Sequence, residues 1–145
     1  MSAVLDAAEI RRLVREALRE DLGLEGDITS KAVVPASVRA RGQIISRQSC
    51  VCAGLPFVQE IYRQLGRGSR VRLRVRDGQR IRKGQTLAEV HGSARVLLAG
   101  ERVSLNFLGR LSGIATLTRR FVDAAHVSGA VILDTRKTTP LIRLA

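Results

Sequence analysis

Aromatic residues are nearly missing from this sequence: of 145 residues, none is tryptophan, one is tyrosine and three are phenylalanine. The hydrophobic fraction is nevertheless 45%, which is enough for a core, so that core has to consist of Leu, Val, Ile and Ala. The scarcity also counts against recognition of single-stranded nucleic acid, because such proteins stack bases on aromatic rings. Nucleic-acid binding through charge alone ranks last among the possible functions, and no nucleic-acid partner is expected.

Long apolar runs and cysteines are scarce too. No apolar run approaches the ~20 residues that a membrane-spanning helix needs, and residues 1–18 carry too many charges for a signal peptide. The two cysteines, Cys50 and Cys52, would point to the same face of a strand. Two thiols cannot close a structural zinc site, and no nearby histidine completes one. We therefore expect two buried, reduced thiols in a soluble, cytoplasmic protein with no membrane partner.

Acidic residues are outnumbered by basic ones, 13 against 25, which gives a formal net charge of +12. All but three of the basic residues are arginine. Such a balance predicts attraction to anions, such as nucleic acid, acidic lipid or a multiply charged small substrate. The arginines are scattered through the chain in runs of no more than two, so most of them are interpreted as a solvated surface.

Several common catalytic motifs are also missing. The sequence holds no glycine-rich phosphate loop of the Walker or dinucleotide type. His91 and His126 are isolated, with no carboxylate or serine at a spacing that suggests a catalytic triad. Asp27, Thr29 and Ser30 could bind a metal or a phosphate. Residues of these types more often cap the next turn of a helix, and we favour that interpretation.

Hydrophobic periodicity predicts an alternation of helices and short strands. Helices are expected at residues 6–20, 56–65 and 97–125, the last one kinked or divided at Ser112 and Gly113; strands are expected within 38–51, at 70–76, on both sides of a turn at Lys83 and Gly84, and at 130–133. The segment EDLGLEGDITS is expected to form a turn region. This order predicts an α+β domain followed by the start of a second, α/β domain.

The segment DGQRIRKGQTLAEVHG, residues 77–92, resembles the compact β-structure of biotinyl- and lipoyl-carrier domains. It lacks a modifiable lysine between hydrophobic residues at a hairpin tip. We therefore interpret it as a β-rich, barrel-sandwich-like module and not as a carrier site.

The segment ILDTRKTTP, residues 132–140, holds the clearest candidate site. Arg136 and Lys137 stand among three threonines, directly after the apolar run at 130–133. An apolar run followed by polar residues is typical of a buried strand that presents its carboxyl end to a ligand. Arginine grips a carboxylate or phosphate with a planar fork, and lysine adds a point charge. The segment is therefore either an anion clamp or a solvated polar tail.

Arg102 and Asn106 are four residues apart, so they share one face of the predicted helix at 97–125. They form either a polar pair that points to a ligand or an ordinary surface pair. In the second case Arg102 is solvated and Asn106 bonds to a neighbouring loop. The sequence alone favours the surface pair, because most polar residues on helices are solvated.

Three segments taken together, EDLGLEGDITS, ERVSLNFLGRLSGIATLTRRFVDA and ILDTRKTTP, resemble quinolinate phosphoribosyltransferase, and the resemblance runs from Glu20 to Pro140. That family converts quinolinate and phosphoribosyl pyrophosphate to nicotinate mononucleotide, carbon dioxide and pyrophosphate, with Mg²⁺, in NAD biosynthesis. The resemblance implies an N-terminal α/β-sandwich domain packed against an incomplete α/β barrel. It also implies a homodimer or higher oligomer, in which the N-terminal domain of one subunit caps the barrel of the other.

The resemblance further implies that Arg102, Thr135, Arg136 and Lys137 contact the substrate. Quinolinate is a dicarboxylate, and several cationic side chains around one planar dianion suit bidentate recognition. They would hold the substrate against the anomeric carbon of the sugar, so catalysis would depend on positioning and charge stabilisation. Arg102 would reach the site across the dimer interface. No catalytic residue and no metal ligand is assigned within this chain.

The sequence departs from the family pattern after Pro140, where LIRLA replaces a Gly-Leu-Arg continuation. A complete α/β barrel takes about 200 residues or more. We therefore expect an N-terminal domain at 1–128 and, at 129–145, the first strand and tail of a truncated barrel that lacks the acidic residues for Mg²⁺. That strand should be frayed, join another sheet or pair with a second chain, because both of its edges are unpaired. The chain alone should be inactive.

Two alternatives stay open. Within the superfamily, a molybdenum-transport-associated relative and nicotinate phosphoribosyltransferase share parts of this architecture, although the segment DTRKTTP favours the quinolinate enzyme. Outside it, the chain could be a non-catalytic remnant or a dimerisation domain, whose long helix would expose an apolar stripe for association.

Overall fold

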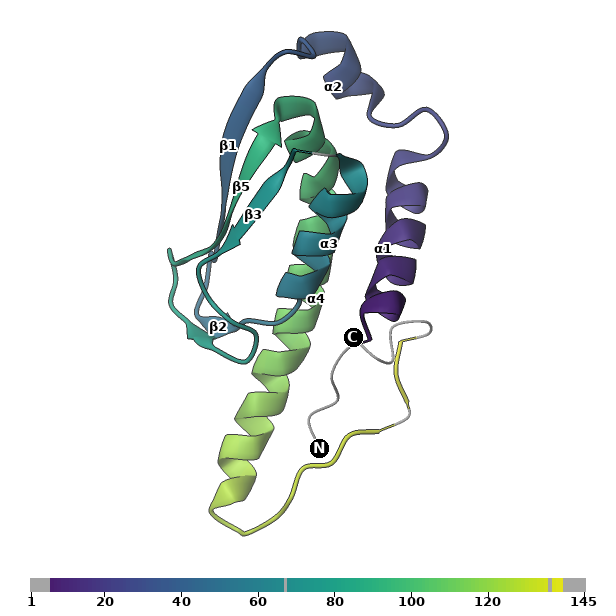
Figure 1. The fold of residues 1–145 in the computed structure, drawn as a ribbon. Helices are drawn as coiled ribbons and strands as arrows, with labels where there is room; N and C mark the ends of the chain where they lie inside the picture. Colours follow the sequence, from purple (N-terminus) through teal and green to yellow (C-terminus); the bar gives the residue numbers. More distant parts are fainter. Residues whose placement is uncertain (1–5, 67, 136, 140–145) are drawn as a thin grey trace.

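Two small β-sheets and four helices make up the computed structural model, which describes residues 6–66, 68–135 and 137–139. In Figure 1 the larger sheet lies on one side, helices α3 (Leu55–Leu65) and α4 (Ala94–His126) run through the middle, and α1 (Ala7–Leu22) lies on the other side. This mixture of helices and antiparallel sheets confirms the expected α+β class.

The larger sheet is antiparallel throughout. It joins, in spatial order, β1 (Arg39–Ile45), β5 (Thr86–Ser93) and β3 (Arg70–Leu73). Val71 of β3 is paired with Val90 of β5, and both pack into the core on the helix side. Because side chains alternate along a strand, the arginines of β3 face outward, as the alternating pattern at 70–76 predicts.

The smaller sheet pairs two short strands, β2 (Cys50–Val51) and β4 (Arg80–Ile81). The predicted turn at Lys83 and Gly84 does lie between two strands, β4 and β5. These strands pair with different partners, so they do not form the expected hairpin. The strand predicted at 70–76 ends earlier, at Leu73.

The N-terminal helices follow their capping signals. A side-chain oxygen of Asp6 accepts a hydrogen bond from the backbone of the first turn of α1, and Gly23, with φ 58°, follows its last residue. The predicted turn region contains the start of an unexpected short helix, α2 (Ile28–Val33). Asp27 begins this helix, because its Oδ1 accepts a hydrogen bond from Ser30 N at 2.9 Å. The capping interpretation of Asp27 is therefore confirmed.

Apolar side chains form two clusters. The cluster on the sheet side consists of Cys52, Leu55, Val58, Tyr62, Val75, Ile81, Leu87, Val90 and Leu108. The cluster shared by α1, α3 and α4 consists of Ile10, Leu13, Val14, Leu18, Phe57, Ile61, Val103 and Leu111. Most members are aliphatic, as the composition predicts, and two of the few rings, Phe57 and Phe107, stack with centroids 4.4 Å apart.

Helix α4 runs without a break from Ala94 to His126, so the predicted division at Ser112 and Gly113 is wrong. Ser112 has another purpose: its Oγ accepts a hydrogen bond from Ala53 N (3.0 Å) and donates one to Ala53 O (3.2 Å). The serine thus holds the loop before α3 against α4. The low helix propensity of Ser112 suggested an interruption of the helix, but the contact with Ala53 explains why a serine is present here.

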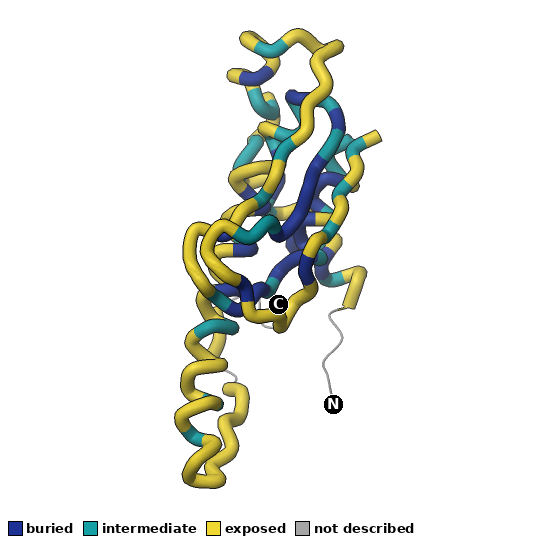
Figure 2. Tube along the Cα trace, turned by 90° about the vertical axis from the view of Figure 1, so that its left-hand side faces the viewer, coloured by how far each residue is buried: buried dark blue, intermediate teal, exposed yellow. Residues whose placement is uncertain are grey.

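The described part of the chain that follows Ser112 lies outside the core. Figure 2 shows the lower part of α4 and the tail as exposed, in contrast to the buried trace above them. No strand forms at residues 130–133, and Val131 and Leu133 are 78% and 81% exposed. The first barrel strand expected here is therefore frayed, which is one of the three outcomes predicted for a strand with two unpaired edges. A strand needs a neighbour to bond its backbone groups, and the described residues place none beside this segment.

Candidate anion-binding site

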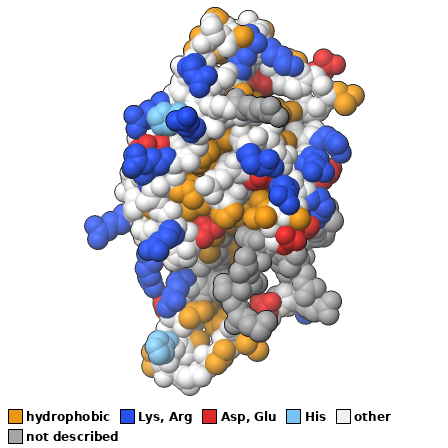
Figure 3. All heavy atoms as spheres, viewed as in Figure 1, with side chains coloured by type: hydrophobic (Ala, Val, Ile, Leu, Met, Phe, Trp, Pro, Cys, Tyr) orange, Lys and Arg blue, Asp and Glu red, His pale blue; other side chains and the backbone are white. Residues whose placement is uncertain are grey.

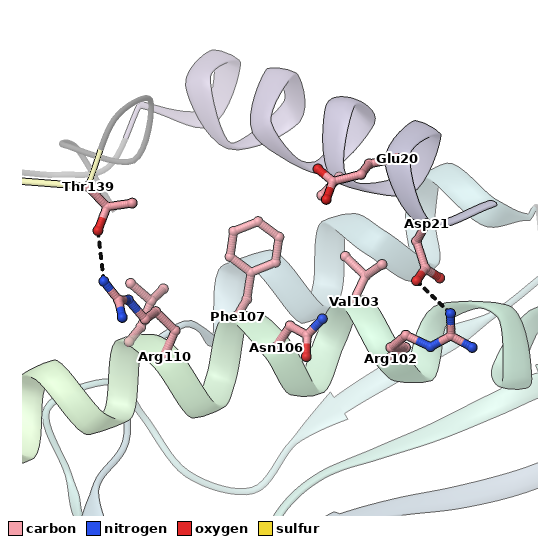
Figure 4. A pocket seen from close by; sticks show the side chains of 10 residues that line it. Glu20, Asp21, Arg102, Val103, Asn106, Phe107, Arg110 and Thr139 are labelled. Carbon is pink, nitrogen blue, oxygen red and sulfur yellow. Dashed lines mark hydrogen bonds and ion pairs between the residues drawn. The ribbon is translucent and has the colours of Figure 1, made fainter. Parts of the chain in front are cut away.

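A hollow of about 530 Å³ lies between α1, α4 and the end of the described tail. Ten residues line it: Ala17, Glu20, Asp21, Arg102, Val103, Asn106, Phe107, Arg110, Leu111 and Thr139. Figure 4 shows α1 above the hollow, α4 below it and the tail at its end. The lining combines apolar side chains with two arginines and two carboxylates, and apolar walls with a few polar groups are usual for small-molecule sites.

Polar residues of α4 enter this hollow in a row. Arg102, Asn106 and Arg110 follow each other at intervals of four residues, so they lie on one face of the helix and span about 12 Å. Val103 and Phe107 alternate with them along the same wall. The predicted pairing of Arg102 with Asn106 on one helix face is therefore present. The sequence reasoning missed Arg110, although its spacing from Asn106 was a signal.

Arg102 is held from the opposite wall by Asp21, which lies in the last turn of α1. Its Nη1 donates to Asp21 Oδ1 at 2.9 Å. The side chain of Arg102 remains 73% exposed, whereas that of Asp21 is only 16% exposed. Arg102 is therefore neither fully solvated nor enclosed: one nitrogen is fixed by a partly buried carboxylate (Figure 4), and most of the side chain is exposed to solvent.

A second carboxylate lies close to Arg102. Asp21, Asp27 and Arg102 all line a neighbouring hollow of about 380 Å³ at the start of α2. The pKa of Asp27 is below its ordinary value, chiefly because Ser30 hydrogen-bonds to the carboxylate, and also because Arg102 and Lys31 bring positive charge near it. The segment EDLGLEGDITS thus surrounds Arg102 with negative charge.

The tail reaches the other end of the row. Arg110 Nη2 donates a hydrogen bond to Thr139 Oγ1 at 2.8 Å, which brings the segment DTRKTT next to the hollow. Within the tail, Lys137 N donates to Thr135 Oγ1 at 3.2 Å. Thr135 and Lys137 are exposed and do not line the hollow, and Arg136 is outside the described residues. Of the four predicted substrate contacts, Arg102 therefore lines the hollow, Thr135 and Lys137 do not, and Arg136 lies outside the described residues.

The two cysteines do not form a reactive site. Cys52 is fully buried, and burial raises the pKa of its thiol to about 12. Both thiols are free, as expected, but Cys50 is only partly buried, so the expectation of two buried thiols is wrong for Cys50. Among the residues that the structure describes, no three His, Cys, Asp or Glu side chains are grouped so that they could hold a metal ion.

Charged side chains outside the hollow are spread over the visible surface and do not form one patch. Figure 3 shows Lys and Arg side chains spread over several elements of the visible face, with acidic side chains between them. On the sheet, the buried carboxylate of Glu89 bonds to two arginines, Arg74 at 2.7 Å and Arg41 at 3.1 Å. Within the described part of the chain, none of the helices is long and apolar enough to cross a membrane.

Two family models match this chain. The model for the N-terminal domain of quinolinate phosphoribosyl transferase matches residues 27–112, and the model for its C-terminal domain matches residues 114–145. Among individual relatives, the nicotinate-nucleotide pyrophosphorylase (carboxylating) of Mycobacterium leprae is 43% identical over 140 residues, which cover 95% of this chain and 49% of the relative. The chloroplastic protein of the same name from Oryza sativa subsp. japonica is 39% identical over 136 residues, 94% of this chain and 36% of the relative.

Solved structures agree with these matches. The nicotinate-nucleotide pyrophosphorylase of Francisella tularensis superposes with a TM-score of 0.91 at 33% identity and covers 97% of this chain, but the match spans 49% of that protein. NadC from Streptococcus pyogenes also gives a TM-score of 0.91, at 34% identity, over 97% of this chain and 50% of its own. This chain thus spans half or less of the length of these relatives. Because a family model covers more than half of the sequence and the fold agrees, the chain belongs to the quinolinate phosphoribosyltransferase family.

Proposed function

We propose that this chain supplies part of the substrate site of an enzyme that makes nicotinate mononucleotide, carbon dioxide and pyrophosphate from quinolinate and phosphoribosyl pyrophosphate. The observation that carries the proposal is the row of Arg102, Asn106 and Arg110 along the hollow between α1 and α4. A dicarboxylate needs at least two donors that can reach both of its acidic groups, and a guanidinium offers the planar fork that suits a carboxylate.

The tail provides the second part of the proposed site. Thr135, Arg136 and Lys137 precede Thr139 in the sequence, and Thr139 accepts a hydrogen bond from Arg110 at the end of this hollow. In the expected dimer, their two cations would neutralise a dianion together with Arg102 from the other subunit, and the threonine hydroxyl would donate to a carboxylate oxygen. The place of Arg102 in the hollow supports the expectation for that residue, whereas the roles of Thr135, Arg136 and Lys137 stay predictions.

The chemistry assigned to these residues is binding and orientation. Cations on opposite sides of a planar pyridine dicarboxylate would fix the ring, so that its nitrogen could face the anomeric carbon of the sugar. They would also offset the repulsion between a dianionic substrate and a phosphorylated co-substrate. We assign no proton transfer and no catalytic residue to the described part of the chain.

Mg²⁺, which the family resemblance implies, does not fit the described residues. Asp21 and Asp27 near the site already bind Arg102 and Ser30, and no group of three potential ligands is found among the residues that the structure covers. We derive no step through the ion. The acidic residues expected to bind Mg²⁺ would lie in the part of the relatives that this chain does not match.

Three further expectations remain predictions. These are the division into domains at 1–128 and 129–145, the homodimer or higher oligomer, and the cytoplasmic location. The two family models meet at residue 113, within α4, which places their boundary inside one continuous helix. Some plant relatives carry chloroplastic or mitochondrial names.

A chimera tests the proposed function. Residues 1–139 of this chain would replace the matching part of the Mycobacterium leprae relative, and formation of nicotinate mononucleotide from quinolinate and phosphoribosyl pyrophosphate would be measured with Mg²⁺. We expect turnover by the chimera and at least a tenfold loss of kcat/KM for quinolinate with Arg102→Gln, since one charge-assisted bond contributes about 1.5–3 kcal/mol. A folded chimera that is inactive, or one that Arg102→Gln leaves unchanged, would contradict the proposal.

A second candidate function is a non-catalytic association domain. The observation in its favour is the row of exposed apolar side chains on the outer part of α4: Ile114, Leu117 and Phe121 are 48%, 56% and 58% exposed. These positions are three and four residues apart, so they share one face. A calorimetric titration with quinolinate distinguishes the two functions, because both allow self-association but an association domain does not bind that ligand.

A further inference from the structure

The segment EDLGLEGDITS contributes to the family resemblance, yet the proposed function gives it no task. In the structure this segment ends α1 and begins α2, and both of its aspartates lie at Arg102. Asp21 bonds to Arg102 Nη1 at 2.9 Å across 81 residues of sequence. Asp27 lies near enough for the charge of Arg102 to help lower its pKa.

We propose that Asp21 is a positioning residue for Arg102, and that Asp27 supports it electrostatically. This inference rests on the proposed function, since it gives Arg102 a ligand to meet. A long arginine side chain that is 73% exposed would otherwise occupy many rotamers. The carboxylate of Asp21 is mostly buried and belongs to a helix, so it can hold the guanidinium before any ligand arrives.

The geometry leaves the ligand side of the guanidinium accessible. Asp21 accepts from Nη1, and no other hydrogen bond of the Arg102 side chain is found among the described residues. A guanidinium carries five N–H donors, so Nε and Nη2 can still make a two-point contact with a carboxylate in the hollow. A single bond from Asp21 therefore orients the fork without occupying it.

A purely structural explanation is the main competitor. The same ion pair could serve only to fasten α1 to α4. In that case Asp21→Asn would lower the melting temperature of the protein. The order of the Arg102 side chain in the folded molecule, and the affinity of the protein for a dianion, would not change. The two explanations therefore differ in what happens at the guanidinium.

The test uses the 145-residue chain and solution NMR. The Nε–Hε signal of Arg102, assigned through Arg102→Lys, reports the order of the side chain, and a titration with quinolinate reports the dissociation constant. We expect the Nε–Hε line of Arg102 in Asp21→Asn to be as narrow as that of a mobile arginine. The dissociation constant for quinolinate should rise about tenfold, as loss of one charge-assisted contact would cause. Asp21→Glu should recover part of both effects. Glu25→Gln, in the same segment, is the matched control and should change neither.

Other outcomes also decide the question. An Arg102 signal that is equally ordered in wild type and Asp21→Asn overturns the inference, whatever quinolinate does. If Asp21→Asn fails to fold, Asp21→Ser decides, because an Arg102 signal as ordered as in wild type, in that folded variant without a carboxylate, contradicts the inference. If wild type and Arg102→Lys respond identically to quinolinate while Asp21→Asn releases Arg102, the proposed substrate is wrong and the positioning contact stands.

Discussion

Gly100 of α4 lies directly against the ring of Tyr62 in α3: a methyl group at Gly100 would sit 2.7 Å from Tyr62 Cε1 and 2.9 Å from Leu65 Cδ1. The same tyrosine donates a hydrogen bond to Leu97 O at 3.3 Å. The two central helices therefore meet at a point where only glycine fits. This crossing determines where the following turns of α4, which carry Arg102 and Asn106, stand relative to α1.

Gly100→Ala should destabilise the protein by about 1–3 kcal/mol, because the added methyl group overpacks the crossing. Gly109→Ala is the matched control in the same helix, since no heavy atom outside the local backbone lies within 4 Å of its methyl position. That control should be neutral or stabilising by up to about 1 kcal/mol, as expected for alanine in a helix. Urea unfolding of both variants provides the measurement. Equal midpoints would contradict the close approach.

The two cysteines should react very differently. Cys52 is fully buried with a pKa of about 12, so about 10⁻⁴ of it is thiolate at pH 8, whereas Cys50 is partly exposed. A chromogenic disulfide reagent at pH 8 should modify one thiol in the native protein and two in urea. Cys50→Ser should abolish the native reaction, and rapid labelling of Cys52 in that folded variant would show that the thiol is accessible.

Glu89 should make stability depend on pH in the acid range. Hydrogen bonds from Arg74, reinforced by the charge of Arg41, hold the pKa of Glu89 below its ordinary value of 4.5. A carboxylate whose pKa is lower in the folded state stabilises that state above the unfolded pKa, and the effect disappears as pH falls through the folded pKa.

The difference in melting temperature between wild type and Glu89→Gln should therefore be present at pH 6–7 and shrink below about pH 4. Glu25→Gln, on an exposed loop residue, is the control and should show no such trend. A difference between wild type and Glu89→Gln that stays constant down to pH 3 would mean that the ion pairs on the sheet do not stabilise the fold.

The 145-residue chain alone should not turn over quinolinate. It spans 36% to 50% of the relatives and solved structures compared above, and the described residues supply cations for binding but no assigned proton donor or metal site. Release of carbon dioxide from labelled quinolinate, with phosphoribosyl pyrophosphate and Mg²⁺, gives the measurement. Sustained release by the isolated chain, absent from an Arg102→Gln sample, would contradict this expectation.

The sequence predicted the elements whose signals are local. The amphipathic pattern and Asp6 predicted α1, and the alternation of Val71 and Leu73 with arginines predicted β3. It failed where tertiary contacts decide the outcome. Ser112 looked like a helix interruption, but its hydroxyl bonds to Ala53, which is 59 residues away in the chain. Residues 130–133 form no strand, because none of the described residues lies beside them as a neighbouring strand. Hydrophobic periodicity cannot show whether such a neighbour is present.

The candidate site was only partly predictable for the same reason. Arg102 and Asn106 could be paired by helical spacing, and Arg110 could have been added by the same rule. The contact of Arg102 with Asp21 joins residues 81 positions apart, and no local pattern indicates such a pair. The bond between Arg110 and Thr139 likewise depends on the path of the tail after α4.

Arg102, Arg136 and Lys137 are proposed to neutralise a pyridine dicarboxylate. The most direct measurement is the quinolinate dissociation constant of the chimera, by calorimetry, for Arg102→Gln, Arg136→Gln and Lys137→Gln beside the outward-facing control Arg72→Gln. We predict that each of the three site variants weakens binding at least tenfold, in line with about 1.5–3 kcal/mol for a charge-assisted bond, and that the control leaves it within a factor of about two. Unchanged affinity in all three site variants would contradict the account.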